Sequence, residues 1–378
     1  MRFRLSILFT ILLTSSLCFG QSTFELKGVV SDANSKEVMP FATVFFAGST
    51  FGTTTNEKGE YSLQVSAAGT YDLIVKFVGY QIYATQVTLG EAEVSRLDIS
   101  ITPGAKDLGS VVVLAKQNAQ WKRYLEDFES VFLGQSINGT NAKILNKEVL
   151  DFSYDEETSQ LSAYSDEPIL IENKELGYTV KYFLEQFILD FPSGISGFYG
   201  YTAFEEIEPK NDRKARALEK NRARAYNGSA THFFKSLYTN ELKEEGFVAE
   251  SSIEETEEGV ASKVINVNLY DILKSSESGD YKQLSFDGYL TISYMKEKES
   301  LRYASATAEK PVTGLSISDR GGNDFQQSQI LLLEGYSSVD FEATGFVRNP
   351  TSFYSLGYWG FEKVGDLVPL DYSPKDKN

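Results

Sequence analysis

The segments FELKGVVSD (residues 24–32), EYSLQV (residues 60–65) and YDLIVKF (residues 71–77) alternate apolar and polar residues with the period of a β-strand. Asn56-Glu57-Lys58-Gly59 places Asn and Gly at the first and fourth positions of a type I turn, just before the second segment. About seven short strands at hairpin spacing fit between Phe24 and Ile101, which predicts a β-sandwich. The residues expected on its buried faces are Phe24, Leu26, Val30, Tyr61, Leu63, Val65, Tyr71, Leu73, Val75 and Phe77.

A series of motifs in this stretch resembles the carboxypeptidase-like regulatory domain. The motifs are G-V-V-S-D, P-F-A-T-V, T-T-N-x-x-G-x-Y and Y-x-L-x-V-x-F-x-G-Y, in that order. Domains of this family are prealbumin-type, or transthyretin-like, β-sandwiches that are common at the N-terminus of Bacteroidota envelope proteins. The resemblance implies a seven-stranded sandwich over residues 21–103 that serves interaction or stabilisation, and it implies no peptidase activity.

Residues 1–20 have the pattern of an export signal. Arg2 and Arg4 precede an apolar run, and cleavage is expected after Gly20. The run is shorter than the roughly 20 residues that span a bilayer, so we expect membrane association only through an N-terminal lipid anchor at Cys18, if that residue is retained. If Cys18 leaves with the signal, the mature chain has no cysteine. The predicted location is the cell envelope, in the periplasm or at the outer membrane.

The chain is acidic. Its formal net charge is −17, and loss of Arg2 and Arg4 with the signal changes this to −19. Such a surface repels nucleic acid and anionic lipid, so neither is an expected partner. An aromatic content of 13% favours sheet, and 378 residues suffice for two or three domains.

Residues 104–118 are predicted to be a linker, and residues 119–375 a second domain of the α+β class. Its expected first element is a helix between Gln117 and Gly134, because Trp121, Leu125 and Phe128 recur at helical spacing. Strand patterns follow at residues 150–155, 160–165 and 168–173. Residues 177–191 fit a helix or a strand, and we predict a strand with one face formed by Tyr178, Val180, Tyr182 and Leu184.

The strand pattern is interrupted between Pro209 and Leu237. Asn211 is a candidate helix cap, Asn227-Gly228 ends the first helix, and Ser229 begins a second. Strand patterns resume after residue 246, so this domain is expected to be a large antiparallel sheet with a helical insertion. Over nearly the whole mature chain, Leu176-Gly177-Tyr178, the run from Arg224 to Phe233, and Gly357-Tyr358-Trp359 resemble a family of exported proteins that carry the regulatory domain and have no established activity.

The chain has one histidine, His232. A zinc hydrolase of the usual kind needs about three protein ligands, and a serine hydrolase would need a G-x-S-x-G motif, which is absent from the sequence. No metal site and no cofactor are predicted, and an enzyme is the less favoured class. One hypothesis joins His232 to Arg224, Tyr226 and Ser229 in an anion site at the start of the second helix, and the alternative is a histidine held within the packing.

Two further features are candidates for binding. The basic run from Lys210 to Arg224 includes Arg213, Arg216 and Lys220 and is either a solvated helix face or a docking surface for an acidic partner. Trp359 and its aromatic neighbours are either core or a stacking surface for sugar or peptide.

The sequence therefore predicts a non-enzymatic envelope protein that binds an envelope protein or a glycan. The alternative is a carbohydrate-active or other hydrolase that uses carboxylates of the second domain. Spacing alone neither nominates nor excludes pairs such as Glu205-Glu206 or the run from Glu254 to Glu258.

Overall fold

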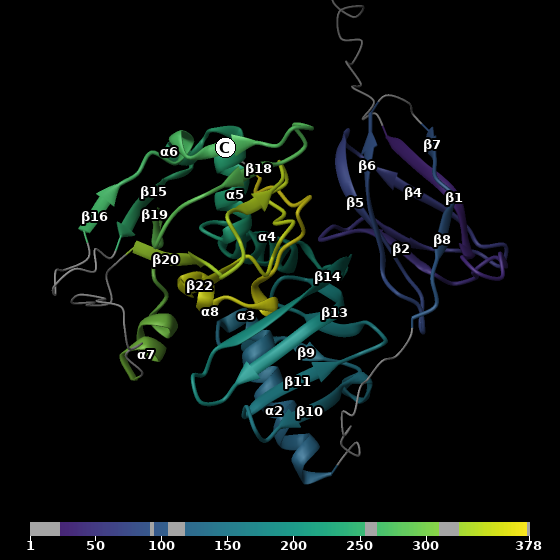
Figure 1. Ribbon diagram of the computed structural model, residues 1–378, viewed down its shortest axis with the longest axis horizontal. Helices are drawn as coiled ribbons and strands as arrows, with labels where there is room; N and C mark the ends of the chain where they lie inside the picture. Colours follow the sequence, from purple (N-terminus) through teal and green to yellow (C-terminus); the bar gives the residue numbers. More distant parts are fainter. Residues whose placement is uncertain (1–22, 91–93, 105–117, 254–262, 310–324, 376–378) are drawn as a thin grey trace, which may run out of the picture.

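The computed structural model describes residues 23–90, 94–104, 118–253, 263–309 and 325–375 (Figure 1). The predicted signal peptide with Cys18, residues 105–117 of the predicted linker and the acidic run from Glu254 to Glu258 lie outside these residues. The described chain is rich in strands, with an N-terminal sandwich followed by antiparallel sheets and helices, which confirms the predicted class.

The sandwich consists of two sheets. One has the order β4-β1-β7, with β8 also paired to β1, and the other has the order β3-β2-β5-β6. The strands are β1 (Phe24–Asp32), β2 (Thr43–Phe46), β3 (Gly52–Thr54), β4 (Glu60–Val65), β5 (Gly69–Lys76), β6 (Tyr83–Leu89), β7 (Val94–Arg96) and β8 (Ile99–Ile101). Leu26, Val30, Leu63, Leu73 and Val75 meet in one core, as the alternation predicted.

Strands β7 and β8 follow one another along the same strand β1. The first pairs with Glu25–Lys27 and the second with Val30–Asp32, both in parallel. Gly28 of β1 lies between these two pairings, where a Cβ atom would be 1.7 Å from the carbonyl oxygen of Leu97. The eight short strands therefore occupy seven positions in the two sheets.

Helix α2 (Ala119–Leu133) covers a six-stranded antiparallel sheet. The helix begins at Asn118, whose side chain accepts a hydrogen bond from the backbone N–H of Trp121, and it ends at Gly134, which has a φ of 91°. Trp121, Leu125 and Phe128 are buried against the sheet, which confirms the predicted helix. The sheet has the order β10 (Asp151–Asp155), β11 (Gln160–Tyr164), β13 (Tyr178–Asp190), β12 (Ile169–Asn173) and β9 (Lys143–Ile144), with β14 (Ser196–Glu206) also paired to β13. Helix α3 (Ile137–Asn141) precedes β9, and η1 (Lys147–Val149) lies between β9 and β10.

The segment whose pattern fitted a helix or a strand is the long strand β13. Tyr178, Val180, Tyr182 and Leu184 are buried in the core under α2, as predicted for one strand face. Phe183 points the other way and belongs to a different cluster.

Three helices follow β14, at the position of the predicted insertion: α4 (Asp212–Tyr226), α5 (Ala230–Thr239) and α6 (Leu242–Glu245). The rest of the chain forms a five-stranded sheet and a three-stranded sheet, which pack around the buried Phe233, Phe234 and Leu237 of α5. The five-stranded sheet has the order β16 (Lys263–Asn266), β15 (Phe247–Ile253), β19 (Tyr289–Lys298), β20 (Phe325–Leu332) and β22 (Phe353–Gly357). The three-stranded sheet has the order β17 (Leu273–Ser275), β18 (Lys282–Leu284) and β21 (Val339–Phe341). The remaining helices are η2 (Leu269–Asp271), α7 (Leu301–Glu309), α8 (Tyr358–Phe361) and η3 (Val364–Asp366). Helix α7 was not predicted from the sequence.

The sandwich is joined to the ribbon of β13 and β14, next to which it lies in Figure 1. Phe45 of β2 stacks on Phe183 of β13, with ring centroids 4.8 Å apart and an interplanar angle of 17°. The backbone N–H of Gly48 donates to Thr202, and that of Phe204 donates to Ser49. We call this contact, with the buried side chains of Phe45, Ala47, Ile74, Phe183 and Ala203, the junction.

Candidate functional site

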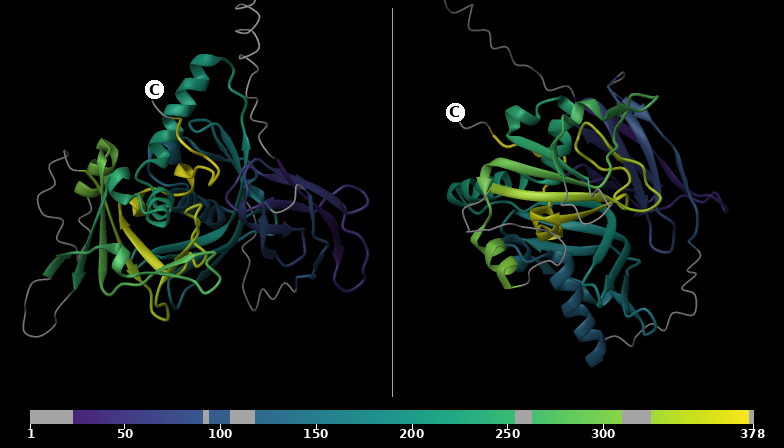
Figure 2. Two further views of the ribbon diagram at one scale, coloured as in Figure 1. Left: turned by 90° about the horizontal axis from the view of Figure 1, so that it is seen from above. Right: turned by 60° about the vertical axis from the view of Figure 1, so that its left-hand side comes forward.

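Helix α4 carries most of the basic residues singled out in the sequence. Asn211 begins it as predicted, since its side chain accepts a hydrogen bond from the backbone N–H of Lys214. Leu218 is buried, and Asn221 donates to the backbone oxygen of Glu175 at 2.9 Å. In the left view of Figure 2, α4 is the teal helix that stands out from the body beside the C-terminus. One face of this helix is thus attached to the protein while the other is free.

Arg222 is the main anchor of α4. Its guanidinium donates to the backbone oxygens of Leu176 at 2.7 Å and Gly177 at 3.2 Å, pairs with Glu206 at 3.0 Å, and lies 4.0 Å from the ring centroid of Tyr178. A planar guanidinium makes several such directed contacts at once, which a lysine cannot do. The helix is therefore held at a fixed orientation on the β12–β13 turn.

The opposite face of α4 displays Arg213, Arg216, Lys220 and Arg224. All four are exposed. At 3.6 residues per turn, positions three, seven and eleven residues after Arg213 fall within an arc of roughly 80° on the helix. No carboxylate in the described part of the chain forms an ion pair with any of them. We call these four residues the basic stripe.

His232 lies in the packing beside the stripe's C-terminal end. It is buried, its Nδ1 accepts a hydrogen bond from the backbone N–H of Gly228 at 3.1 Å, and its Nε2 is 3.2 Å from a carboxylate oxygen of Glu245. Burial lowers the pKa of His232 to about 4, although the Glu245 carboxylate acts in the opposite direction. Both ring nitrogens are engaged by the protein, and the imidazole is neutral at pH 7.

Three other predicted binding residues are near His232. The ring of Tyr226 is 4.7 Å from that of His232, and the Ser229 hydroxyl accepts a hydrogen bond from the His232 backbone N–H. Trp359 is buried, and its indole N–H donates to Gly228 at 2.7 Å. Tyr226, Ser229, His232 and Trp359 thus form one packed cluster, whereas Arg224 is directed outward with the basic stripe.

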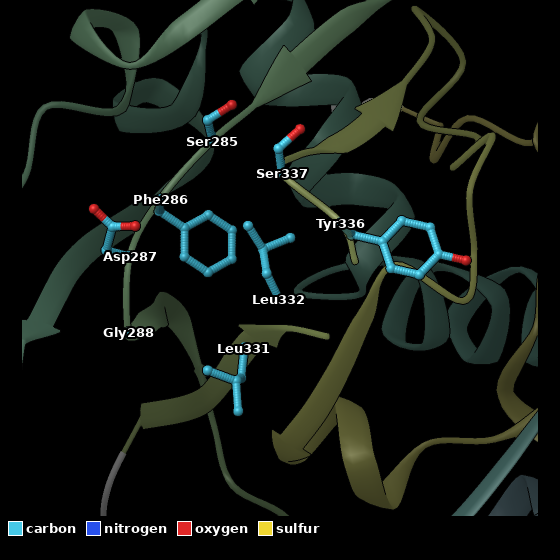
Figure 3. A pocket seen from close by; sticks show the side chains of 8 residues that line it. All are labelled: Ser285, Phe286, Asp287, Gly288, Leu331, Leu332, Tyr336 and Ser337. Carbon is cyan, nitrogen blue, oxygen red and sulfur yellow. The ribbon is translucent and has the colours of Figure 1, made fainter. Parts of the chain in front are cut away.

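An open pocket of about 500 Å³ lies between the turn before β19 and the segment after β20. Its lining includes Phe286, Asp287, Leu332 and Tyr336. In Figure 3, Asp287 and Tyr336 lie at opposite ends of the labelled side chains, with the ring of Phe286 between them. Among the lining residues there is one carboxylate, whereas glycoside hydrolysis usually requires two.

The adjacent carboxylates Glu205 and Glu206 form ion pairs. Glu205 pairs with Lys181, and Glu206 pairs with Arg222. Within the described residues, no group of three or more His, Cys, Asp or Glu side chains is arranged to hold a metal ion. No helix of the described chain is long and apolar enough to cross a membrane.

A carboxyl pair at the edge of the junction was not found from the sequence. Glu342 is 4% exposed, accepts a hydrogen bond from Gln86 of the sandwich at 2.6 Å, and lies 3.7 Å from Arg348. Its carboxyl is hydrogen-bonded to that of Asp72 of β5. Burial and the nearby Asp72 raise the pKa of Glu342 to about 8, so the pair holds a proton at neutral pH. No local pattern links residues 270 positions apart, and this pair is visible only in the folded chain.

Comparison with known proteins identifies the first module. Residues 26–113 match the family model of the CarboxypepD_reg-like domain, which confirms the resemblance seen in the motifs. The match accounts for the sandwich and not for residues beyond 113. No curated protein matches the chain.

Several solved structures are similar over part of the chain. One is a chain of a type II cohesin–X–dockerin complex from Acetivibrio cellulolyticus, 21% identical with a TM-score of 0.19, covering 21% of this chain and 58% of that one. The chain therefore spans just over half the length of that structure. Others are a protein described as membrane-associated and of unknown function from Bacteroides fragilis (14% identical, TM-score 0.18, 43% and 64% covered) and a DUF3823 family protein from Bacteroides ovatus (12% identical, TM-score 0.15, 49% and 82% covered). At these TM-scores the similarities support no conclusion about the whole chain.

Proposed function

We propose that this chain is a non-enzymatic binding protein of the cell envelope, in which the sandwich is a structural platform and helix α4 docks an acidic partner. The regulatory-like domain at residues 26–113 and the export pattern of residues 1–20 support the location in the envelope. The partner is an envelope protein or a glycan.

The observation that carries this proposal is the basic stripe. Four exposed cations that form no ion pair with any described residue lie on a fixed helix in a chain whose net charge is −17. Like charges at neighbouring helix positions repel and destabilise the helix slightly. An anion that binds to the stripe would neutralise this repulsion, which gives the four cations a physical role.

The test is charge reversal on the stripe. The mature protein is immobilised and exposed to solubilised envelope from its source cells at low salt, and retained protein and sugar are measured. The triple variant Arg213→Glu, Arg216→Glu, Lys220→Glu should lose the retained material, and 0.5 M salt should release it from the unchanged protein.

The matched control reverses three exposed basic residues outside the stripe, Lys122, Arg123 and Lys143. It changes the net charge equally and should retain the material. Equal retention by the stripe variant and the control would contradict the proposal, because the binding would then follow total charge or another surface.

The hydrolase alternative gains no support from a specific observation. The pocket lining supplies one carboxylate, and the adjacent Glu205 and Glu206 are paired with Lys181 and Arg222.

A further inference from the structure

The basic stripe has the shape of a line. Eleven residues separate Arg213 from Arg224, which at 1.5 Å per residue is about 16 Å along the helix axis. Neighbouring positions on one helix face are about 5–6 Å apart. The stripe thus offers cations at intervals comparable to the length of a sugar unit, along a path one side chain wide.

No apolar anchor accompanies the stripe. Within residues 196–247, all of which the structure describes, no large hydrophobic side chain is exposed. Protein–protein interfaces owe most of their affinity to aromatic or aliphatic side chains that become buried at their centre. The stripe offers charge without such a centre, which disfavours a folded protein as its partner.

The net charge of the chain and the side chains that α4 exposes disfavour three other partners. A second copy carries the same net charge of −17 and is repelled. A flat anionic membrane would be repelled by the net negative charge of the chain, and α4 has no large exposed apolar residue to insert into it. Single-stranded nucleic acid is bound by proteins that stack its bases on aromatic side chains, and α4 exposes none.

We infer that the basic stripe binds a linear acidic polysaccharide, one with a carboxylate on successive sugars. This rests on the proposed function and assigns the class of its partner. A thin polyanion touches the stripe while its remaining length leads away from the acidic surface. Three of the four cations are arginines, whose planar guanidinium pairs with carboxylates through two parallel hydrogen bonds. Arg222 keeps the helix in place while the ligand binds.

The test is titration of the mature protein with polygalacturonate oligomers, a chain of uronic acids, by calorimetry at several salt concentrations. Neutral dextran of similar length should not bind. The variant Arg216→Gln, Lys220→Gln should bind about tenfold more weakly, since each exposed charge contact contributes modestly. Its plot of log affinity against log salt should be shallower by about one for each cation removed.

The control variant Lys122→Gln, Arg123→Gln changes the net charge equally and should bind polygalacturonate as the unchanged protein does. Both variants alter exposed residues, and circular dichroism checks that each is folded. Poly-glutamate, a single-stranded oligonucleotide and vesicles with anionic lipid are titrated in parallel. Tighter binding of any of these than of polygalacturonate, or equal binding by the two variants, would overturn the inference.

Failure of the inference is distinguishable from failure of the proposed function. If polygalacturonate does not bind but the stripe still retains envelope material that charge reversal releases, then the site is real and its partner is of another class. If neither experiment depends on the stripe, then both ideas are wrong.

Discussion

Replacing Phe183 with alanine should uncouple the unfolding of the sandwich from that of the rest of the chain. Phe183 is 3% exposed and stacks on Phe45 across the junction. Its neighbours Tyr182 and Leu184 point into the core under α2, and Val44 and Phe46 point likewise into the core of the sandwich. Truncating either junction phenylalanine therefore removes contacts between the two parts without opening a cavity inside either core.

The magnitude follows from this geometry. Truncation of a buried phenylalanine to alanine costs about 3–5 kcal/mol, and a stacked aromatic pair contributes about 0.5–1.5 kcal/mol beyond its buried area. Because Phe45 and Phe183 are each other's partner, the double variant should cost less than the sum of the single variants, by about 1 kcal/mol or more.

The two tryptophans, Trp121 and Trp359, lie outside the sandwich, so their fluorescence follows only the C-terminal part, whereas far-ultraviolet circular dichroism follows the whole chain. In urea the two signals should coincide for the unchanged protein and separate for Phe183→Ala. Phe191→Ala, at an exposed phenylalanine just beyond β13, is the control and should leave them coincident. Coincident curves for Phe183→Ala, or strictly additive costs in the double variant, would refute the role assigned to the junction.

Three further predictions concern buried groups. Burial lowers the folded-state pKa of His232 to about 4, so the free energy of unfolding should be constant above about pH 6.5 and fall by roughly 3 kcal/mol toward pH 4. The variant His232→Gln should flatten this profile when unfolding is measured at a series of acidic pH values. The pKa of Glu342 is raised, so the junction should weaken as pH rises from about 4.5 through about 8. The separation of the fluorescence and circular dichroism unfolding curves, measured against pH, should show this trend. The double variant Asp72→Asn, Glu342→Gln should not show it. Gly228 has a φ of 79° and no room for a Cβ atom, so Gly228→Ala should destabilise the protein by more than about 1 kcal/mol and lower its thermal midpoint. The same change at Gly279, which has a similar φ and open space, should lower the midpoint less.

Much of the fold can be predicted from local patterns in the sequence. The alternation in β4 and β13 and the helical spacing in α2 each record which face is buried, and the cap residues Asn211 and Ser229 mark where α4 and α5 begin. These features depend on neighbours in the sequence, which is why they are predictable. Helix α7 also begins at a cap, because the Ser300 hydroxyl accepts a hydrogen bond from the backbone N–H of Tyr303, but its pattern was not recognised.

The candidate site can be predicted from the sequence only in part. The sequence offered the basic run with Arg213, Arg216 and Lys220 as either a solvated helix face or a docking surface. Which of its side chains are exposed depends on the face that Leu218 and Arg222 attach to the β12–β13 turn. The sequence likewise offered His232 as either a ligand or a packed residue, and the partners that occupy its nitrogens come from Gly228 and Glu245. Tertiary contacts determine which side chains are exposed and which partners they bind, and these contacts cannot be predicted from neighbouring residues in one sequence.

The junction also sets the order in which this protein is completed. The backbone N–H of Thr50 in the sandwich donates to the carboxylate of Asp371, a residue 321 positions later. Chains emerge from the ribosome N-terminus first, and a contact of such long range closes slowly because a large loop must be ordered. The sandwich is therefore made before its docking surface can be covered, because Phe45 and Ile74 pack against Phe183 of β13 and Ala203 of β14, and the contact with Asp371 comes last. A chain interrupted before β13 would leave that apolar face uncovered, and it would be a target for chaperones and proteases in the compartment where it folds.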